Sequence, residues 1–147
     1  MMRYAETPAK QKYEMLEFQR FVKAHGIPFN MNPRFPLNTL YVMRGAVAAQ
    51  RLDCLVPYVD AVMTAMWHDK ADLGDLDVVR DILDKANLDS AALLALAEDP
   101  EVKAELMANT ETAAKRGAFG VPTFFVGDEM FWGKERLGQI EVELTKS

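Results

Sequence analysis

The spacing at which apolar residues recur changes at Gly117, and this change restricts the possible folds more than any other feature. Upstream of Gly117, apolar residues recur at the spacing of α-helices, with capping residues and prolines between the runs. Downstream, the short runs PTFFV (122–126) and MFW (130–132) flank a GDE turn and predict a β-hairpin. A last helix is expected over 134–146. The predicted fold class is therefore mainly α, with one C-terminal β-hairpin and a helix.

Local signals place the helices upstream of the hairpin. Thr7 and Pro8 are suited to cap and start a first helix that Gly26 ends, and the proline-rich stretch 27–36 predicts a loop. Asn38 is placed to cap the next helix, where Gly45 and nearby alanines allow close packing. Further helices are expected over 57–70, 76–87, 90–98 and 100–116. In the first of these, a stripe of Val59, Val62, Met63 and Met66 predicts the core-facing side.

Length and composition exclude several classes of protein. With 147 residues, we expect a single domain over 1–147, with a helical region over 8–116 and a C-terminal region over 117–147. A net charge of -5 without a basic cluster argues against a nucleic-acid partner. The sequence shows neither an apolar run long enough for a membrane span nor a signal peptide, which predicts a cytoplasmic protein. Cys54 is the one cysteine, so we expect no intrachain disulfide and no metal site, and we expect Cys54 to pack as a small apolar residue.

Several quoted segments together resemble one family. The segments are GAFGVPTFFV, followed by FWGKERL, and upstream of them FPLNTLYVMRGAVAA, PYVDAVMTAMW and DPEVKAELMANTETAAKRG. Together they resemble the glutathione-dependent 2-hydroxychromene-2-carboxylate isomerases and the kappa-class glutathione transferases. These belong to the DsbA-like thioredoxin superfamily, and the resemblance spans 8–137. It implies a DsbA-like helical domain joined to the hairpin and last helix of an incomplete thioredoxin fold. GVPTFFV alone suggests no more than a thioredoxin-like fold.

The resemblance implies a glutathione site around the proline of GVPTFFV. It implies that the Val121–Pro122 bond is cis and that the Val121 backbone pairs with the cysteinyl part of glutathione. The alternative is that Pro122 only starts a strand, where its missing donor does no harm. Glu135 matches an acidic residue of the family that binds the γ-glutamyl amino group. Lys134 beside it occupies a position where the family usually has a small or neutral residue. An exposed first-turn carboxylate is the alternative for Glu135.

Other site residues follow from the same resemblance. Lys10 matches a lysine that pairs with the glycine carboxylate of glutathione, and Tyr13 follows one turn later. An ordinary exposed side chain is the alternative for Lys10. The small aromatic substrate is implied to lie near Trp132, Asn38 and Arg44. Trp132 as a core residue and Asn38 as a helix cap are the alternatives.

The family's catalytic serine has no counterpart in this sequence. Its segment, which resembles SPYS, stabilises the glutathione thiolate, and neither Ser90, in a capping context, nor Ser147 is a substitute. The expected function is glutathione-dependent cis–trans isomerisation through transient thiol addition, with no catalytic residue assigned and activity in doubt. The alternative is a non-catalytic homologue. In either case, strand 122–126 lacks the neighbour of the thioredoxin order, so its exposed edge predicts a homodimer.

Overall fold

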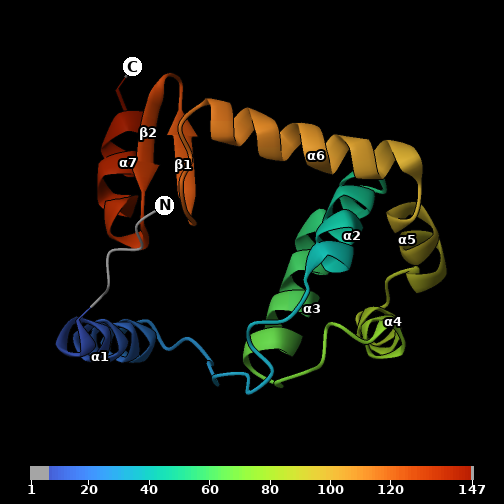
Figure 1. Ribbon diagram of the computed structural model, residues 1–147. Helices are drawn as coiled ribbons and strands as arrows, with labels where there is room; N and C mark the ends of the chain where they lie inside the picture. Colours follow the sequence, from blue (N-terminus) through green and yellow to red (C-terminus); the bar gives the residue numbers. More distant parts are fainter. Residues whose placement is uncertain (1–6, 147) are drawn as a thin grey trace. The chain divides into compact units, whose positions relative to one another are not determined.

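The computed structural model describes residues 7–146, which divide into two compact units between Val102 and Lys103. The first unit holds α1 to α5, and the second holds most of α6, the hairpin and α7 (Figure 1). The helices and strands are α1 (Pro8–Ala24), α2 (Leu40–Arg51), α3 (Leu55–Trp67), α4 (Leu76–Lys85), α5 (Ser90–Ala97), α6 (Pro100–Lys115), β1 (Thr123–Val126), β2 (Glu129–Trp132), the 3-10 turn η1 (Lys134–Arg136) and α7 (Leu137–Leu144). The predicted fold class is confirmed.

Local capping fixes where most of these helices begin. The Thr7 side chain accepts a hydrogen bond from the Lys10 backbone amide, and Pro8 occupies the first helical position of α1. Asp75 and Asp89 cap α4 and α5 in the same way. The Asp99 carboxylate accepts a bond from the Glu101 amide at the start of α6. Each of these contacts lies within one helical turn, which is why the sequence predicted these starts.

The first unit has an apolar core formed by α2, α3, α4 and α5. In Figure 1, α2 and α3 lie side by side, and α5 lies against α2. Gly45 makes the approach of α3 possible, because a Cβ at this position would lie 2.2 Å from the Tyr58 Oη atom. That hydroxyl donates to the Val42 carbonyl at 2.8 Å. Burial raises the pKa of Tyr58, so its phenol stays neutral as a donor. The fully buried members of this core include Val79, Leu83 and Leu93.

A buried asparagine fixes the proline-rich loop to this core. The Asn32 side-chain amide donates to the Met66 carbonyl at 3.1 Å and to the Ala71 carbonyl at 2.9 Å. Its oxygen accepts from the Arg34 amide, so the buried group has its partners. Nearby, Phe29 stacks on Trp67 with ring centroids 5.4 Å apart. The loop is therefore ordered by specific contacts with α3.

The position of α3 differs from the prediction in two respects. The helix begins at Leu55, which places Pro57 in the first turn, where its missing amide donor removes no helical bond. Of the predicted core stripe, Met66 is buried and Val62 packs against the core, but Val59 and Met63 are exposed. The side of α3 that faces the core is formed by Tyr58, Val62, Ala65 and Met66. The predicted core role of Val59 and Met63 was wrong.

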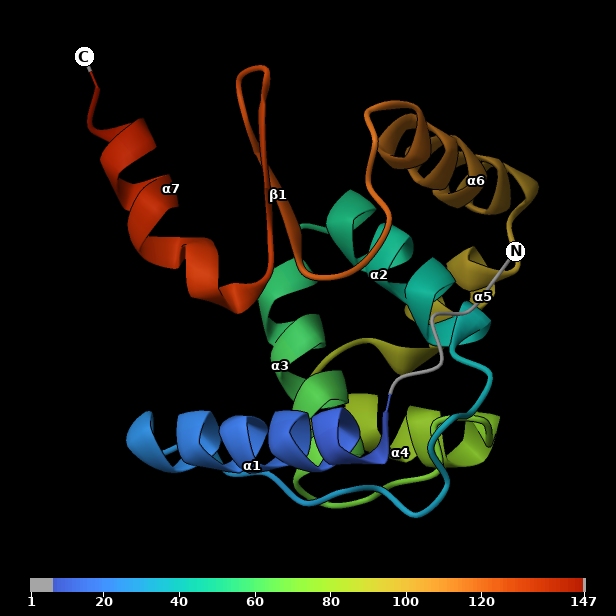
Figure 2. The ribbon, with the colours of Figure 1, turned by 60° about the vertical axis from the view of Figure 1, so that its left-hand side comes forward.

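The second unit contains an antiparallel hairpin with α7 beside it (Figure 2). In the register, Thr123 lies opposite Trp132 and Val126 opposite Glu129. Gly127 occupies the turn with a φ of +57°, a conformation that favours glycine. At the end of α6, the Arg116 guanidinium donates to the Gly127 carbonyl at 2.8 Å and lies 3.7 Å from the centre of the Phe125 ring. These contacts connect α6 to the hairpin within the unit.

None of the helices found in residues 7–146 has both the length and the apolar character needed to cross a membrane.

Candidate functional site

The residues around Pro122 form a loop that is held by two hydrogen bonds. The Val121–Pro122 peptide bond is cis, as predicted. The Thr123 hydroxyl donates to the Gly120 carbonyl at 2.5 Å, and the Gly133 amide donates to the Pro122 carbonyl at 3.0 Å. The second bond joins the start of β1 to the residue after β2. It therefore places the Pro122 loop directly beside the segment that carries Lys134 and Glu135.

Val121 is the most exposed point of this loop. The residue is 91% exposed, although valine is usually buried. Within residues 7–146, no hydrogen bond to the backbone amide or carbonyl of Val121 is formed. These groups are open to an extended ligand, which could pair with them as a neighbouring strand would. This is the geometry that the predicted clamp requires.

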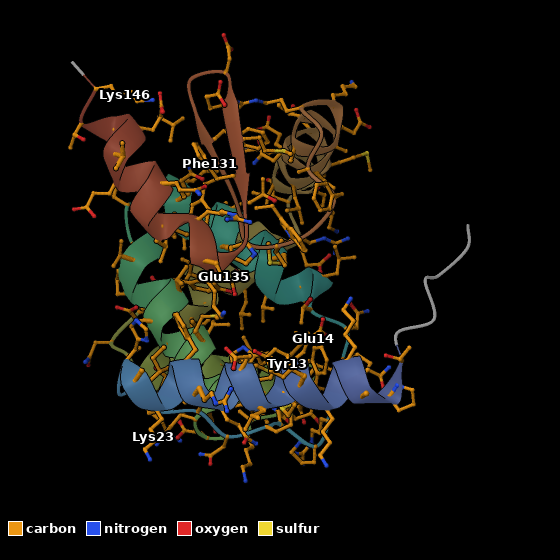
Figure 3. All side chains as sticks on the ribbon, turned by 90° about the vertical axis from the view of Figure 1, so that its left-hand side faces the viewer. Tyr13, Glu14, Lys23, Phe131, Glu135 and Lys146 are labelled. Atoms are coloured by element: carbon orange, nitrogen blue, oxygen red, sulfur yellow. The ribbon has the colours of Figure 1, made fainter. Side chains whose placement is uncertain are left out.

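Glu135 lies in the η1 turn that leads into α7, and its carboxylate is exposed (Figure 3). The side chain of Lys134 forms a hydrogen-bonded ion pair with it. This hydrogen bond, with a backbone hydrogen bond as the next cause, lowers the pKa of the Glu135 carboxyl, so the group is anionic at neutral pH. Gly133 adopts a φ of +99°, and a Cβ there would lie 2.7 Å from the Glu135 Oε2 atom. The positive φ favours glycine at this position, whereas the flexible Glu135 side chain could move away from a Cβ.

An exposed aromatic pair lies next to Val121. The Trp132 side chain is half exposed, and its ring centroid lies 5.0 Å from that of Phe119. A Cβ on Gly120 would lie 2.8 Å from the Trp132 Nε1 atom, so the indole edge lies against the backbone of the loop. The exposure of Trp132 argues against the alternative that it is a core residue. We call Phe119, Val121 and Trp132 the apolar patch.

The remaining predicted site residues lie in the first unit. Lys10 forms an ion pair with Glu14 at 3.5 Å on α1, and Tyr13 on the same helix is exposed (Figure 3). The Asn38 side chain accepts from the Leu40 amide, but the cap position of α2 is occupied by Thr39, so the prediction that Asn38 is the cap was wrong by one residue. The Arg44 guanidinium approaches the Glu98 carboxylate at 3.9 Å. Roles of these four residues towards a ligand stay predictions.

Three contributors to the site were missed by sequence reasoning. Phe119 forms the patch with Trp132, Thr123 holds the loop, and Gly133 makes room for Glu135. Gly133 had a visible signal, since a glycine directly after a strand often adopts a positive φ. Phe119 and Thr123 had none, because their contacts depend on how the loop folds back on β2.

The model of the DSBA-like thioredoxin domain matches residues 2–145. The chain belongs to the DSBA-like thioredoxin family. Its helical unit and its cis-proline hairpin are the two parts of this family's fold that the described residues contain.

Relatives within this family are 2-hydroxychromene-2-carboxylate isomerases. The chain is 31% identical to the isomerase of Pseudomonas putida and 32% identical to that of Pseudomonas sp. strain C18, each over 90% of its own length. It is 27% identical to the isomerase of Sphingobium xenophagum over 92% of its length. The chain spans 64%, 61% and 69% of these three relatives. The resemblance seen in the sequence is confirmed.

Solved structures agree with this family assignment. The chain superposes on a 2-hydroxychromene-2-carboxylate isomerase with a TM-score of 0.80 and 26% identity, covering 92% of this chain and 66% of the isomerase. It also matches a Nitrosomonas europaea protein described as a candidate protein disulfide isomerase, with a TM-score of 0.63 and 16% identity over 88% of this chain and 68% of that one. The second likeness supports the DSBA-like fold alone.

Proposed function

We propose that the second unit carries the glutathione-binding part of a 2-hydroxychromene-2-carboxylate isomerase site. The observation that carries this proposal is the Val121 backbone, which has no hydrogen-bond partner in the described residues and belongs to a loop that the hydrogen bond from Gly133 to Pro122 joins to the segment carrying Glu135. The names of the relatives supply the reaction class, and the geometry supplies the binding chemistry.

The residues present fit a γ-glutamyl tripeptide. A peptide ligand needs backbone groups to pair with, and the Val121 amide and carbonyl are available for this. An α-amino group needs an anion, and Glu135 is exposed and has a lowered pKa. The hydrogen bond from Lys134, a residue that departs from the family pattern, lowers the pKa of this carboxyl.

Glutathione, when bound, supplies the thiol whose transient addition to the substrate permits rotation about the former double bond. The part of this chain is to hold and orient that thiol through the Val121 backbone. The apolar patch offers an aromatic surface next to the same loop, suited to a small aromatic substrate. Of the two serines in the sequence, Ser90 is buried at the start of α5, and Ser147 lies outside the described residues. We therefore assign no thiolate-stabilising residue to this chain.

The test is a calorimetric titration of the chain with reduced glutathione. We expect saturable binding near one per chain, weakened about threefold to fivefold by Glu135→Gln, because an exposed ion pair contributes modestly. Glu141→Gln is the matched control, since Glu141 is an exposed carboxylate on α7. No heat up to millimolar glutathione would contradict the proposal.

A second ligand separates the role of Glu135 from a general charge effect. Cysteinylglycine lacks the γ-glutamyl group but keeps the cysteinyl backbone that is proposed to pair with Val121. We expect Glu135→Gln to leave its affinity unchanged within twofold. Equal losses for both ligands would show that Glu135 does not bind the γ-glutamyl amino group.

The second candidate function is a non-catalytic homologue of the isomerases. The ion pair of Lys134 with Glu135 favours it, because it occupies the carboxylate that would bind the ligand's amino group. An assay of chromene isomerisation with the glutathione-loaded chain separates the two, because a non-catalytic homologue binds glutathione without accelerating the reaction.

A further inference from the structure

A groove with a volume of about 620 Å³ lies between α3 and α4 in the first unit. Four of the residues that line it are alanines, namely Ala61, Ala65, Ala71 and Ala86, and Val78 and Ile82 line it from α4. Because an alanine side chain ends at Cβ, α3 and α4 pack against each other here without filling the space beside them. The volume lies within the range of about 300–1,000 Å³ that is usual for small-molecule sites.

The lining of this groove carries more negative than positive charge. Asp60, Asp69 and Asp81 line it with exposed side chains, and Lys85 is the one basic residue among them. The Asp69 carboxylate lies 2.7 Å from the Nδ1 atom of His68. Asp60 and Asp81 form no ion pair with any residue that the structure describes, although Lys85 follows Asp81 by one helical turn. These two carboxylates are therefore available to a cation from solution.

The sequence around the groove strengthens this negative charge. Residues 57–89 contain eight aspartates and three basic residues, which gives a net charge of -5 with histidine neutral. The whole chain has the same net charge of -5, so the charges of its remaining residues balance. Two of the eight aspartates, Asp72 and Asp77, are paired with arginines. A surface with this excess of negative charge attracts cations and repels anions.

We propose that this groove binds a small amphipathic cation, in which one ammonium group is attached to a hydrocarbon chain or ring. The hydrocarbon part covers the apolar lining, Ala61 and Ile82 included, and removes it from water. The ammonium group supplies the partner that the carboxylates of Asp60 and Asp81 lack. A carboxylate ligand of the same shape is repelled, and an alcohol lacks the ion pair.

This site is independent of the proposed glutathione site. All residues that line the groove belong to the first unit, whereas Val121 and Glu135 belong to the second. Loss of glutathione binding would therefore leave the groove proposal intact, and failure of the groove proposal would leave the glutathione site intact.

The first experiment is an NMR titration of the ¹⁵N-labelled chain with 4-phenylbutylamine at neutral pH. We expect saturable shifts of the amide signals of Ala61, Thr64 and Ile82, with a dissociation constant of about 1–5 mM for a ligand of about eleven non-hydrogen atoms. The alcohol and the carboxylate with the same hydrocarbon part, 4-phenylbutanol and 4-phenylbutyrate, should bind about threefold and at least about tenfold more weakly. No saturable shift of these signals up to about 20 mM amine, or equal affinities for amine and alcohol, would overturn the proposal.

A pair of charge variants tests the contribution of the groove carboxylates. Asp81→Asn should weaken binding of the amine about threefold and leave binding of the alcohol unchanged, because an exposed ion pair contributes modestly. Asp84→Asn is the matched control, since Asp84 is an exposed carboxylate on the same helix that does not line the groove. Equal losses for the two variants would show that the amine responds to the overall charge of α4 and would overturn the assignment.

A filling variant tests whether the hydrocarbon part occupies the groove. Ala61→Leu places three more carbon atoms in the space that the ligand would take, so we expect the amine and the alcohol both to bind at least about fivefold more weakly. Unchanged affinities would overturn the proposal. If circular dichroism shows that Ala61→Leu does not fold, Ala61→Val serves instead with a smaller expected loss of about twofold.

Discussion

The two units of this chain differ in how much apolar surface they bury. The first unit encloses Val79, Leu83 and Leu93 almost completely. In the second unit, Ile140 on α7 is the buried apolar side chain among the described residues 103–146, and every residue of β1 is only partly buried. The order of the first unit rests on packing, whereas that of the second rests on hydrogen bonds, one cation–π contact and glycines at special conformations.

Because of this difference, the residues that stabilise the fold and the groups proposed to bind glutathione lie in different units. A closed helical core leaves few backbone groups open, because helices satisfy their own donors and acceptors except at their ends. In the hairpin unit, the Val121 backbone has no hydrogen-bond partner among the described residues. The backbone groups that suit recognition of a peptide therefore lie in the unit with the smaller core.

The largest expected effect lies in the core of the first unit. Leu83→Ala removes a side chain that is 1% exposed, so it should lower the free energy of unfolding by about 2–5 kcal/mol. Leu144→Ala is the control in the second unit, because Leu144 is mostly exposed, and a change within about 0.5 kcal/mol is expected. Denaturant unfolding followed by circular dichroism measures both. Similar losses for the two variants would remove the contrast in burial between the units.

A smaller effect is expected from Gly133→Ala in the second unit. The alanine would have to adopt a φ of +99°, and its Cβ would meet the Glu135 carboxylate. Such backbone strain costs about 1–3 kcal/mol. Hydrogen exchange should show faster opening of the hairpin amides with no change in α2, whereas Gly138→Ala, with open space around its Cβ position, is the control. Unaltered hairpin exchange would mean that the turn relaxes without strain.

The smallest effect concerns the titration of Glu135. Lys134→Ala removes the hydrogen bond that contributes most to the lowered pKa of Glu135, so that pKa should rise towards the ordinary glutamate value. Since the bond favours the ionised folded form, its contribution to stability is present above the unfolded pKa and is lost as the pH falls through the folded pKa. Carbon-detected NMR titration measures the shift. Lys146→Ala, which removes the partner of Glu143, should leave Glu135 unchanged.

Features that depend on neighbours along the chain could be predicted from the sequence. The cap at Thr7, the turn at Gly127 and the resemblance around Pro122 all lie within short segments. The face of α3 could not be predicted in this way. This helix carries apolar residues on more than one side, so the periodicity left open which side faces the core, and the exposed Val59 and Met63 were assigned wrongly.

The site was predicted less completely than the fold, for a similar reason. Glu135 and Val121 could be matched to a family pattern, but the contacts that position them depend on the folded loop. Two of these contacts could be identified only in the folded structure. They are the ion pair of Lys134 with Glu135 and the hydrogen bond that the Gly133 amide donates to the Pro122 carbonyl. The departure from the family pattern at Lys134 therefore adds an ion pair to Glu135.

The positions of the two tryptophans give the chain a built-in optical probe for each unit. Trp67 stacks on Phe29 in the first unit, and Trp132 lies against Gly120 and Phe119 in the second. With either indole replaced by phenylalanine, the remaining emission reports on one unit alone. Quenching or a spectral shift of the Trp132 emission reports a change at the loop, whereas the Trp67 emission is expected to stay unchanged. The molecule thus separates its two halves spectroscopically without any added label.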